Sequence, residues 1–260
     1  NVYPIPLMYI DIVSDLHVEH WDSFPYDWEK NKQSDVVVIA GDISDSIDLT
    51  VRELIKACKV YTYVLFVDGN HESGDLNTNS SQLDLSIDVI RDRMTGFSNF
   101  FSLHHEICRF LNIAFVGSCL WWNFSNSDQV KRDFSAHMHP RVIQQIEQTA
   151  NTHAEVLHEQ IQQLSEDSSI DTIVVVTHTL PHSLLVTNSS YPKNDRYKPM
   201  YFNSRAESFF DYPKVKYFIF GHSHDAKIHT IMNKTCINNA RGRPHDFNRQ
   251  HYEPYTVFIR

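Results

Sequence analysis

The sequence predicts an α/β fold built from layers of sheet and helix. Two observations carry this prediction: short apolar runs rich in β-branched residues recur along the chain, and amphipathic patterns of helical spacing lie between them. Runs this apolar are typical of strands buried on both faces, and strands that alternate with helices are typical of α/β layers. The predicted strands are Tyr9–Val13, Val36–Ala40, Tyr61–Val67, Ile113–Val116, Ile170–Val176, Val215–Phe220 and Tyr255–Ile259.

Three segments between these strands have the spacing of helices. Asp45–Lys59 and Gln82–Met94 are the shorter two, and Asp45 is of a residue type that often caps a helix N-terminus. Pro140–Glu166 is the longest, with Pro140 near its start, where proline is favoured. Its apolar residues recur on one stripe, which predicts a helix packed on the core.

The chain is predicted to form a single domain over residues 1–260. It has 260 residues, of which 42% are hydrophobic, enough to bury a sizeable core. The length also fits two small domains, but no linker, repeat or low-complexity segment divides the chain. Thr177–Arg205 contains proline, asparagine, serine and tyrosine throughout and is predicted to be a loop. Because loops this long are usually functional, we expect residues 177–205 to face the substrate.

Charge and targeting signals exclude several classes of function. The net charge of −9 argues against non-specific nucleic-acid binding, which depends on Lys and Arg, but not against a phosphate substrate. No run of 18 apolar residues predicts a membrane span, and Asn1–Leu7 lacks the basic region of a signal peptide. The four cysteines show no CxxC spacing. They are interpreted as reduced thiols of a cytoplasmic protein.

Polar residues of metal-ligand type follow five of the predicted strands. The segments are Ser14-Asp15-Leu16-His17, Gly41-Asp42, Asp68-Gly69-Asn70-His71-Glu72, Thr177-His178 and Gly221-His222-Ser223-His224. Open α/β sheets bind their ligands at the carboxyl ends of the strands. Asp-x-His is expected by chance about once in this composition, whereas Gly-Asn-His is expected roughly 0.03 times. The ordered set therefore indicates a site although single members do not.

The spacing and chemistry of this set predict a metal site with two ions. Side chains at i and i+2 of an extended segment point the same way, so Asp15 with His17, and His222 with His224, are expected to form chelating pairs. Carboxylate and imidazole donors together suit Mn²⁺, Fe, Zn²⁺ or Ni²⁺. Seven such residues are too many for one tetrahedral ion. The glycines before the ligands, Gly41, Gly69 and Gly221, are expected where the backbone turns tightly or approaches another segment closely.

The order D-x-H, G-D, G-N-H-E, H, G-H-x-H resembles that of the calcineurin-like metallophosphoesterases. The resemblance extends from Tyr9 to about Arg243 and is strongest to small prokaryotic-type members, through the stretches SDLHVE, VGSCLWWNF and CINNARG. It implies a four-layer α/β sandwich of two mixed β-sheets flanked by helices. It also implies a dinuclear metal centre and a metal-dependent phosphoric ester hydrolase.

Carried over residue by residue, the resemblance implies a role for each member of the set. Asp15, His17 and His224 bind one metal, Asn70, His178 and His222 bind the other, and Asp42 bridges them. His71 lies beside the phosphate, and Asp45 orients it. The implied reaction is attack of a metal-bridging hydroxide on phosphorus, with His71 as general acid and transition-state stabiliser. For Asp45, a helix-capping role is the alternative.

Other residues are candidates for contacts with the substrate or are assigned to packing. Arg196, Lys198, Arg205, Arg241 and Arg243 are candidate phosphate clamps, among which Arg205 and Arg241 are selected together with His182. Family members often have N-P-R-G-Y where this chain has Asn239-Ala240-Arg241-Gly242-Arg243. Trp121 and Trp122 are expected to pack beneath the site, and His104-His105 is interpreted as a solvated turn.

The predicted activity is hydrolysis of a small phosphodiester or a nucleotide substrate. Phosphomonoesterase and protein phosphatase are the alternatives, and a non-catalytic scaffold of the same fold is a weaker one, because every ligand residue and His71 are present.

Overall fold

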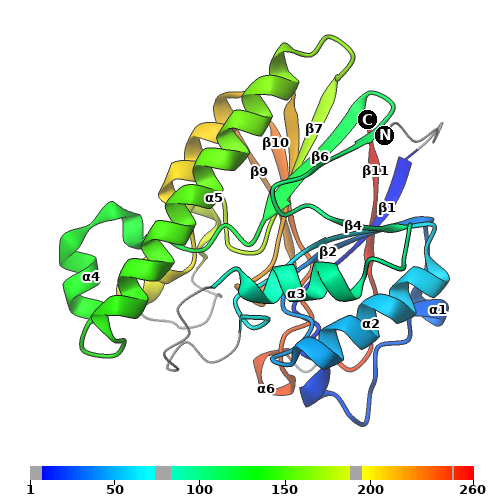
Figure 1. Cartoon of the computed structure of the whole chain (residues 1–260), viewed down its shortest axis with the longest axis horizontal. Helices are drawn as coiled ribbons and strands as arrows, with labels where there is room; N and C mark the ends of the chain where they lie inside the picture. Colours follow the sequence, from blue (N-terminus) through cyan, green and yellow to red (C-terminus); the bar gives the residue numbers. More distant parts are fainter. Residues whose placement is uncertain (1–7, 74–82, 188–194, 248) are drawn as a thin grey trace.

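The protein is described by a computed structural model that covers residues 8–73, 83–187, 195–247 and 249–260. Two mixed sheets form its centre (Figure 1). The first has the order β11 (Tyr255–Ile259), β1 (Met8–Val13), β2 (Val36–Ala40), β3 (Tyr63–Val67) and β4 (Phe100–Ser102). Its strands β1 to β4 are parallel, and β11 runs antiparallel to β1.

The second sheet has six strands. Its order is β5 (Ile107–Phe110), β6 (Ile113–Ser118), β7 (Thr172–Thr177), β8 (Val215–Phe220), β10 (Lys234–Asn238) and β9 (Lys227–Ile231). Strands β6, β7, β8 and β10 are parallel, whereas the edge strands β5 and β9 are antiparallel to their neighbours.

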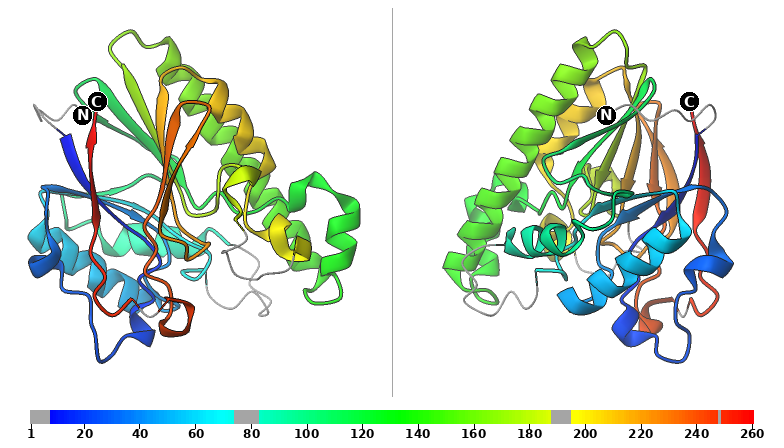
Figure 2. Two further views of the ribbon diagram at one scale, coloured as in Figure 1. Left: turned by 180° about the vertical axis from the view of Figure 1, so that it is seen from behind. Right: turned by 45° about the vertical axis from the view of Figure 1, so that its right-hand side comes forward.

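The two sheets pack face to face, and helices cover both outer faces (Figures 1 and 2). Ile10, Val38 and Leu65 of the first sheet share a buried cluster with Phe115 and Val174 of the second. On the outer face of the first sheet lie α1 (Trp28–Asn31), α2 (Ile47–Val60) and α3 (Leu85–Arg93), and on that of the second lie α5 (Pro140–Glu166) and the 3-10 helix η5 (Ser204–Asp211). The four-layer sandwich that the sequence implies is therefore confirmed.

Strong apolar patterns predicted the elements well, and weaker ones were missed. All seven predicted strands are present, and α5 has the predicted bounds. Four strands were missed: β4 has only three residues, while β5, β9 and β10 carry charged or polar residues. The shorter elements α4 (Asp128–Phe134), α6 (Pro244–Phe247), η1 (Val18–His20) and η2 (Phe124–Asn126) were also not predicted.

Two boundary predictions need correction. Helix α2 is capped by Ser46, whose side chain accepts a hydrogen bond from the amide of Leu49, so Asp45 is not the cap. The segment 177–205 is not simply a loop, because it contains η3 (Ser183–Leu185), η4 (Asp195–Met200) and the start of η5. Residues 188–194 of that segment, residues 1–7, and the predicted helix residue Gln82 lie outside the described part of the chain.

The structure also bears on membrane-spanning helices and on the cysteines. Within the described ranges, no helix is long and apolar enough to cross a membrane. Cys58, Cys108, Cys119 and Cys236 are all buried and form no disulfide in the structure.

Candidate metal centre

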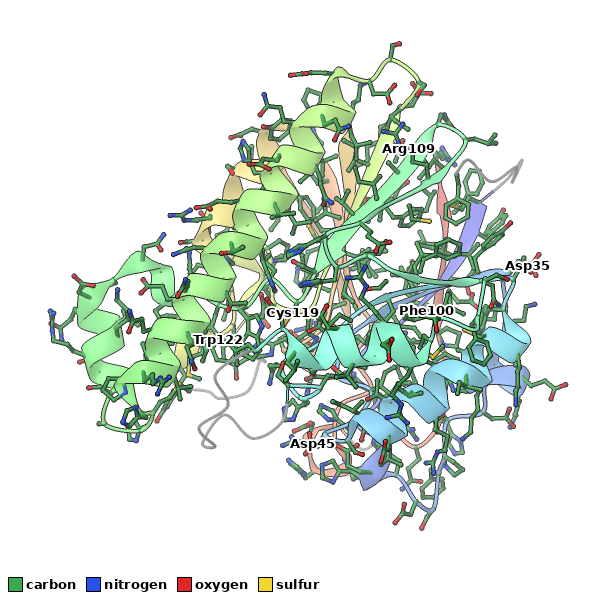
Figure 3. The ribbon with its side chains drawn as sticks, viewed as in Figure 1. Asp35, Asp45, Phe100, Arg109, Cys119 and Trp122 are labelled. Atoms are coloured by element: carbon green, nitrogen blue, oxygen red, sulfur yellow. The ribbon has the colours of Figure 1, made fainter. Side chains whose placement is uncertain are left out.

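The predicted ligand residues meet where the parallel strands of both sheets end. Asp15, Asp42 and Asn70 follow β1, β2 and β3 of the first sheet, and His178 and His222 follow β7 and β8 of the second. In Figure 3, Asp45 and Trp122 lie toward this end of the sandwich, whereas Asp35 and Arg109 lie near the opposite strand ends. The centre is therefore built at the junction of the two sheets.

The ligand residues form two groups that share one carboxylate. Asp15, His17, Asp42 and His224 place one ligand atom each within 4.8 Å of one another, and Asp42, His178 and His222 do the same. The side-chain oxygen of Asn70 adds to the second group, at 3.1 Å from Nε2 of His178 and 2.9 Å from Nδ1 of His222. The arrangement has the donors for two ions with Asp42 between them.

The outward nitrogen of each histidine in the centre faces an oxygen. Nδ1 of His178 lies 2.8 Å from the carbonyl of Ala40, and Nε2 of His222 lies 3.0 Å from the carbonyl of Met200. Since a carbonyl only accepts, these nitrogens must carry the proton. Nδ1 of His224 faces Asp246 at 2.6 Å in the same way. Such outer contacts orient metal-binding imidazoles and fix their tautomer.

Because the outward ring nitrogens carry the protons, the inward nitrogens present lone pairs to one another and to the oxygens of the centre. Nε2 of His17 lies 3.0 Å from Nε2 of His224, while Nδ1 of His17 lies 3.6 Å from Glu19. Nε2 of His178 lies 3.1 Å from both the Asp42 carboxylate and Asn70 Oδ1. Acceptors this close repel unless a proton or a cation lies between them. The residues present therefore fit divalent metal ions.

The pKa values of the ligand residues also indicate that the centre favours a bound positive charge. Burial alone would lower the pKa of His178, but the facing carboxylate of Asp42 outweighs it and raises this pKa to about 10. Burial is likewise outweighed at His224, where Asp15 and Asp246 raise the pKa to about 9. For Asp42, burial is opposed by the surrounding histidines, which hold its pKa well below the usual range. The carboxylates stay ionised, and a metal ion supplies the charge that protons would otherwise carry.

The backbone around the ligands is left-handed rather than extended. Asp15, His17, His222 and His224 have φ between 41° and 66°. Non-glycine residues in this region are uncommon and concentrate at functional sites. The prediction that these pairs lie on extended backbone is therefore wrong. Asp15 and His17 still belong to one ligand group, whereas His222 and His224 belong to different groups and do not chelate one ion as a pair.

Gly41 shows why glycine stands before a ligand. Its φ is +81°, and a Cβ there would lie 2.6 Å from Nδ1 of His178 and 2.7 Å from the backbone nitrogen of Gly69. Close approach and a turn are thus both required, as the sequence predicts.

His71 lies at the edge of the centre, between the carboxylate of Asp45 and the guanidinium of Arg243. Its Nδ1 is 2.5 Å from Asp45, and its Nε2 is 3.3 Å from the Arg243 guanidinium and 3.9 Å from Asp42. Its backbone N–H donates to Asp42. The predicted contact between Asp45 and His71 is present, and the other imidazole nitrogen faces the cavity.

That cavity has a volume of about 370 Å³, within the range of small-molecule sites. Its base is polar and its wall is largely aromatic, and the residues that line it are Asp42, Asn70, His71, Trp122, Tyr197, Met200, Tyr201, His222, Ser223, His224 and Arg243. The ring of Trp122 stacks on His222 with an interplanar angle of 21°. Trp121 and Trp122 are buried, as predicted.

Comparison with known proteins identifies the family to which this site belongs. A family model described as calcineurin-like phosphoesterase matches residues 8–226. The chain belongs to the calcineurin-like phosphoesterase family. The family match and the grouped metal-ligand residues identify this phosphoesterase as a metal-dependent phosphoester hydrolase.

One sequence relative and two solved structures match this phosphoesterase over nearly its whole length. An uncharacterized protein of Acanthamoeba polyphaga mimivirus is 24% identical, with 94% of each chain covered. The phosphopantetheinyl hydrolase of Mycobacterium tuberculosis has a TM-score of 0.77 at 14% identity, over 99% of this chain and 96% of that one. A dimetal phosphatase of Danio rerio has a TM-score of 0.59 at 16% identity, over 98% and 93%. At these identities the structural likeness concerns the fold alone.

The structure does not bring the three predicted substrate contacts to the phosphoesterase cavity. Arg241 is buried, lies 4.1 Å over the ring of Trp21 and donates to the carbonyl of Phe24. Arg205 pairs with Glu155 of α5 at 2.6 Å. His182 accepts a hydrogen bond from the amide of Leu184.

Each of these three side chains is engaged in the packing of its own segment, so none lines the cavity. Arg243, in contrast, does line it. Of the other candidate clamps, Lys198 is not among the cavity residues, and the side chain of Arg196 lies outside what the structure describes.

Three acidic residues that support the centre were not predicted. Glu19 and Asp246 face the outer nitrogens of His17 and His224. Glu72 is buried and accepts from the backbone amides of Asp42, Ile43 and Gly69, which ties together the two loops that carry Asp42 and Asn70. The sequence carries only weak signals for these three roles. Glu19 and Glu72 each lie two residues after a ligand residue, which could have marked them, whereas Asp246 is distant from His224 in the sequence.

Replacing Asp246 by asparagine is expected to weaken metal binding by roughly 10- to 100-fold. Asparagine keeps the shape and accepts from the amide of Arg243, but it loses the charge that holds Nδ1 of His224 protonated. Titration of metal-depleted protein with Mn²⁺ in a calorimeter measures the change. The exposed Asp22→Asn variant is the control. Unchanged affinity in Asp246→Asn would contradict the orienting role.

Proposed function

We propose that this phosphoesterase is a dinuclear-metal phosphodiesterase that acts on a small substrate with an aromatic or apolar ester group. The observation that carries the proposal is the cavity, in which the polar base formed by the ligand residues continues into a wall of Trp122, Tyr197 and Tyr201. The base suits a phosphoryl group, and the wall suits a planar substituent such as a nucleobase.

The charges of the cavity favour a diester over a monoester. Among the described residues that line the cavity, Arg243 is the one that carries a guanidinium or ammonium group. A diester carries one negative charge and a monoester about two at neutral pH, so the monoester would call for more positive charge at the rim. A diester also retains a second substituent, for which the aromatic wall gives space.

The ligand set proposed for the two ions is Asp15, His17, Asp42 and His224 on one side and Asp42, Asn70, His178 and His222 on the other. When bound, two divalent ions such as Mn²⁺, Fe, Zn²⁺ or Ni²⁺ lower the pKa of water and neutralise phosphoryl charge. The protein's own part is to hold these donors fixed through the outer contacts of Ala40, Met200 and Asp246.

His71 is proposed to protonate the leaving oxygen. Its Nδ1 is held by Asp45, which leaves Nε2 as the nitrogen that faces the cavity. Arg243 lies 3.3 Å from that nitrogen, so both groups reach the same phosphoryl oxygens. Together they stabilise charge that develops on the phosphoryl and leaving oxygens.

The proposal is tested by comparing bis-p-nitrophenyl phosphate with p-nitrophenyl phosphate, in the presence of Mn²⁺, Ni²⁺ or Zn²⁺ separately. We expect kcat/KM to favour the diester by at least about tenfold with the preferred metal, a difference of about 1.4 kcal/mol in transition-state binding. A strong preference for the monoester would overturn the diester assignment, and activity toward phosphopeptides alone would indicate a protein phosphatase.

A variant of the aromatic wall adds a sharper prediction. Tyr197→Ala is expected to raise KM for the bis-aryl diester by about 3- to 30-fold and to leave kcat within about twofold, because Tyr197 lines the wall and not the base. The matched control is Leu184→Ala, a substitution at an exposed side chain that does not line the cavity. If Tyr197→Ala lowers kcat with KM unchanged, the wall does not bind the ester group.

A further inference from the structure

Three histidines meet at a second place in the fold, outside the candidate metal centre. His104 and His105 lie in the turn between β4 and β5, and His153 lies on α5. One ring nitrogen of each lies within 4.8 Å of the others. The rings of His104 and His105 stack with centroids 3.9 Å apart, and the ring of His153 stands edge-on to both. The interpretation of His104-His105 as a solvated turn is wrong for His104, which is 3% exposed.

Three buried ring nitrogens of this cluster lack a hydrogen-bond partner among the described residues. His153 is fully buried, and within the described ranges neither of its ring nitrogens has a hydrogen-bond partner. Nδ1 of His104 is also buried and has no hydrogen-bond partner among the described residues. Buried polar groups are almost always satisfied, because an unpaired one loses its hydration without compensation. Two adjacent unsatisfied imidazoles therefore point to a ligand that binds nitrogen lone pairs.

A carboxylate lies beside the three histidines. Asp84, at the start of α3, places Oδ1 3.2 Å from Nε2 of His153, without the alignment of a hydrogen bond. Three imidazoles form a donor set that Zn²⁺ takes up readily in tetrahedral sites, in which water fills the fourth position.

We propose that His104, His105 and His153 form a separate Zn²⁺ site with a structural role, and that Asp84 of α3 holds His153 at that site. The site would join three segments that belong to different layers. Strand β4 ends the first sheet and β5 begins the second, so the turn with His104 and His105 crosses between the sheets. Helix α3 covers the first sheet, and α5 covers the second. His105 is exposed, so the ion has a path from solvent.

Metal stoichiometry tests this site independently of the proposed phosphodiesterase activity. The purified chain is depleted of metal with a chelator, reloaded with Zn²⁺, separated from free metal and analysed by mass spectrometry. We expect three equivalents in the wild type and two in His105→Ala, whose exposed side chain can be removed without opening the core. His137→Ala, another exposed histidine, is the control and should retain three.

A second variant separates the two kinds of site. Asp42→Asn, which disrupts the shared ligand of the other centre, should retain one equivalent of Zn²⁺ and a Zn²⁺-dependent rise in melting temperature. Adding His105→Ala to it should abolish both. If His105→Ala binds as much Zn²⁺ as the wild type, or if Asp42→Asn binds none while it remains folded, the cluster is a buried ion pair between His153 and Asp84 and the proposal is overturned. Hydrolysis by His105→Ala with saturating Mn²⁺ should stay within about twofold of the wild type.

Discussion

Asp42→Asn is expected to lose both ions of the candidate centre and nearly all hydrolytic activity. Asp42 is the carboxylate common to the two ligand groups, so its charge acts on both ions at once. Loss of an outer partner alone typically costs 10- to 100-fold in metal affinity, so loss of this shared ligand should cost more than about 100-fold for each ion. Calorimetric titration with Mn²⁺ and turnover of the preferred ester measure the two effects.

The geometry makes this substitution a clean test of the bridging role. Oδ1 of Asp42 accepts the backbone N–H of His71, and an asparagine oxygen can do the same, so the loop should keep its conformation. The other oxygen faces His178 at 3.1 Å, and there the substitution removes a negative charge. Asp45→Asn is the matched control, because it alters a nearby carboxylate that contacts His71 and belongs to neither of the two ligand groups that contain Asp42. If Asp42→Asn binds two Mn²⁺ with normal affinity, Asp42 does not bridge.

The sequence predicted which residues would lie together at this candidate centre, because the signal for their placement is local. Short motifs such as Gly69-Asn70-His71 and Gly221-His222-Ser223-His224 each follow a strand, and parallel strand ends must meet at the same edge. The orientation of the side chains was less predictable. Left-handed φ values at His222 and His224 turn the two rings into different groups, and no pattern of residue types encodes that turn.

The sequence also could not show which arginine reaches the cavity. Arg241 and Arg243 are both candidate phosphate ligands by sequence, but Gly242 between them has a φ of +71°, in the left-handed region. Arg241 is thereby stacked on Trp21, while Arg243 reaches the cavity. Contacts between distant segments, such as Asp246 with His224, depend on the complete fold and carry no local signal.

His71→Asn is expected to retain both ions and to lose about 10²- to 10⁴-fold in kcat, the range that general acid catalysis contributes. The side chain of His71 belongs to neither of the two groups that contain Asp42, although its backbone N–H donates to Asp42. Its substitution should therefore leave the affinity for Mn²⁺ within about threefold of the wild type. Steady-state kinetics at saturating Mn²⁺ measure the loss.

Two further measurements distinguish a proton donor from a residue that merely supports the site. A donor to the leaving oxygen matters most when that oxygen is basic, so His71→Asn should lose more activity toward phenyl esters than toward p-nitrophenyl esters, by roughly tenfold. Asp45 acts through His71 at 2.5 Å, so Asp45→Asn should lower kcat in the wild type and add little in the His71→Asn background. Equal losses for both leaving groups, together with additive effects of the two substitutions, would show that His71 stabilises the phosphoryl oxygens without donating a proton.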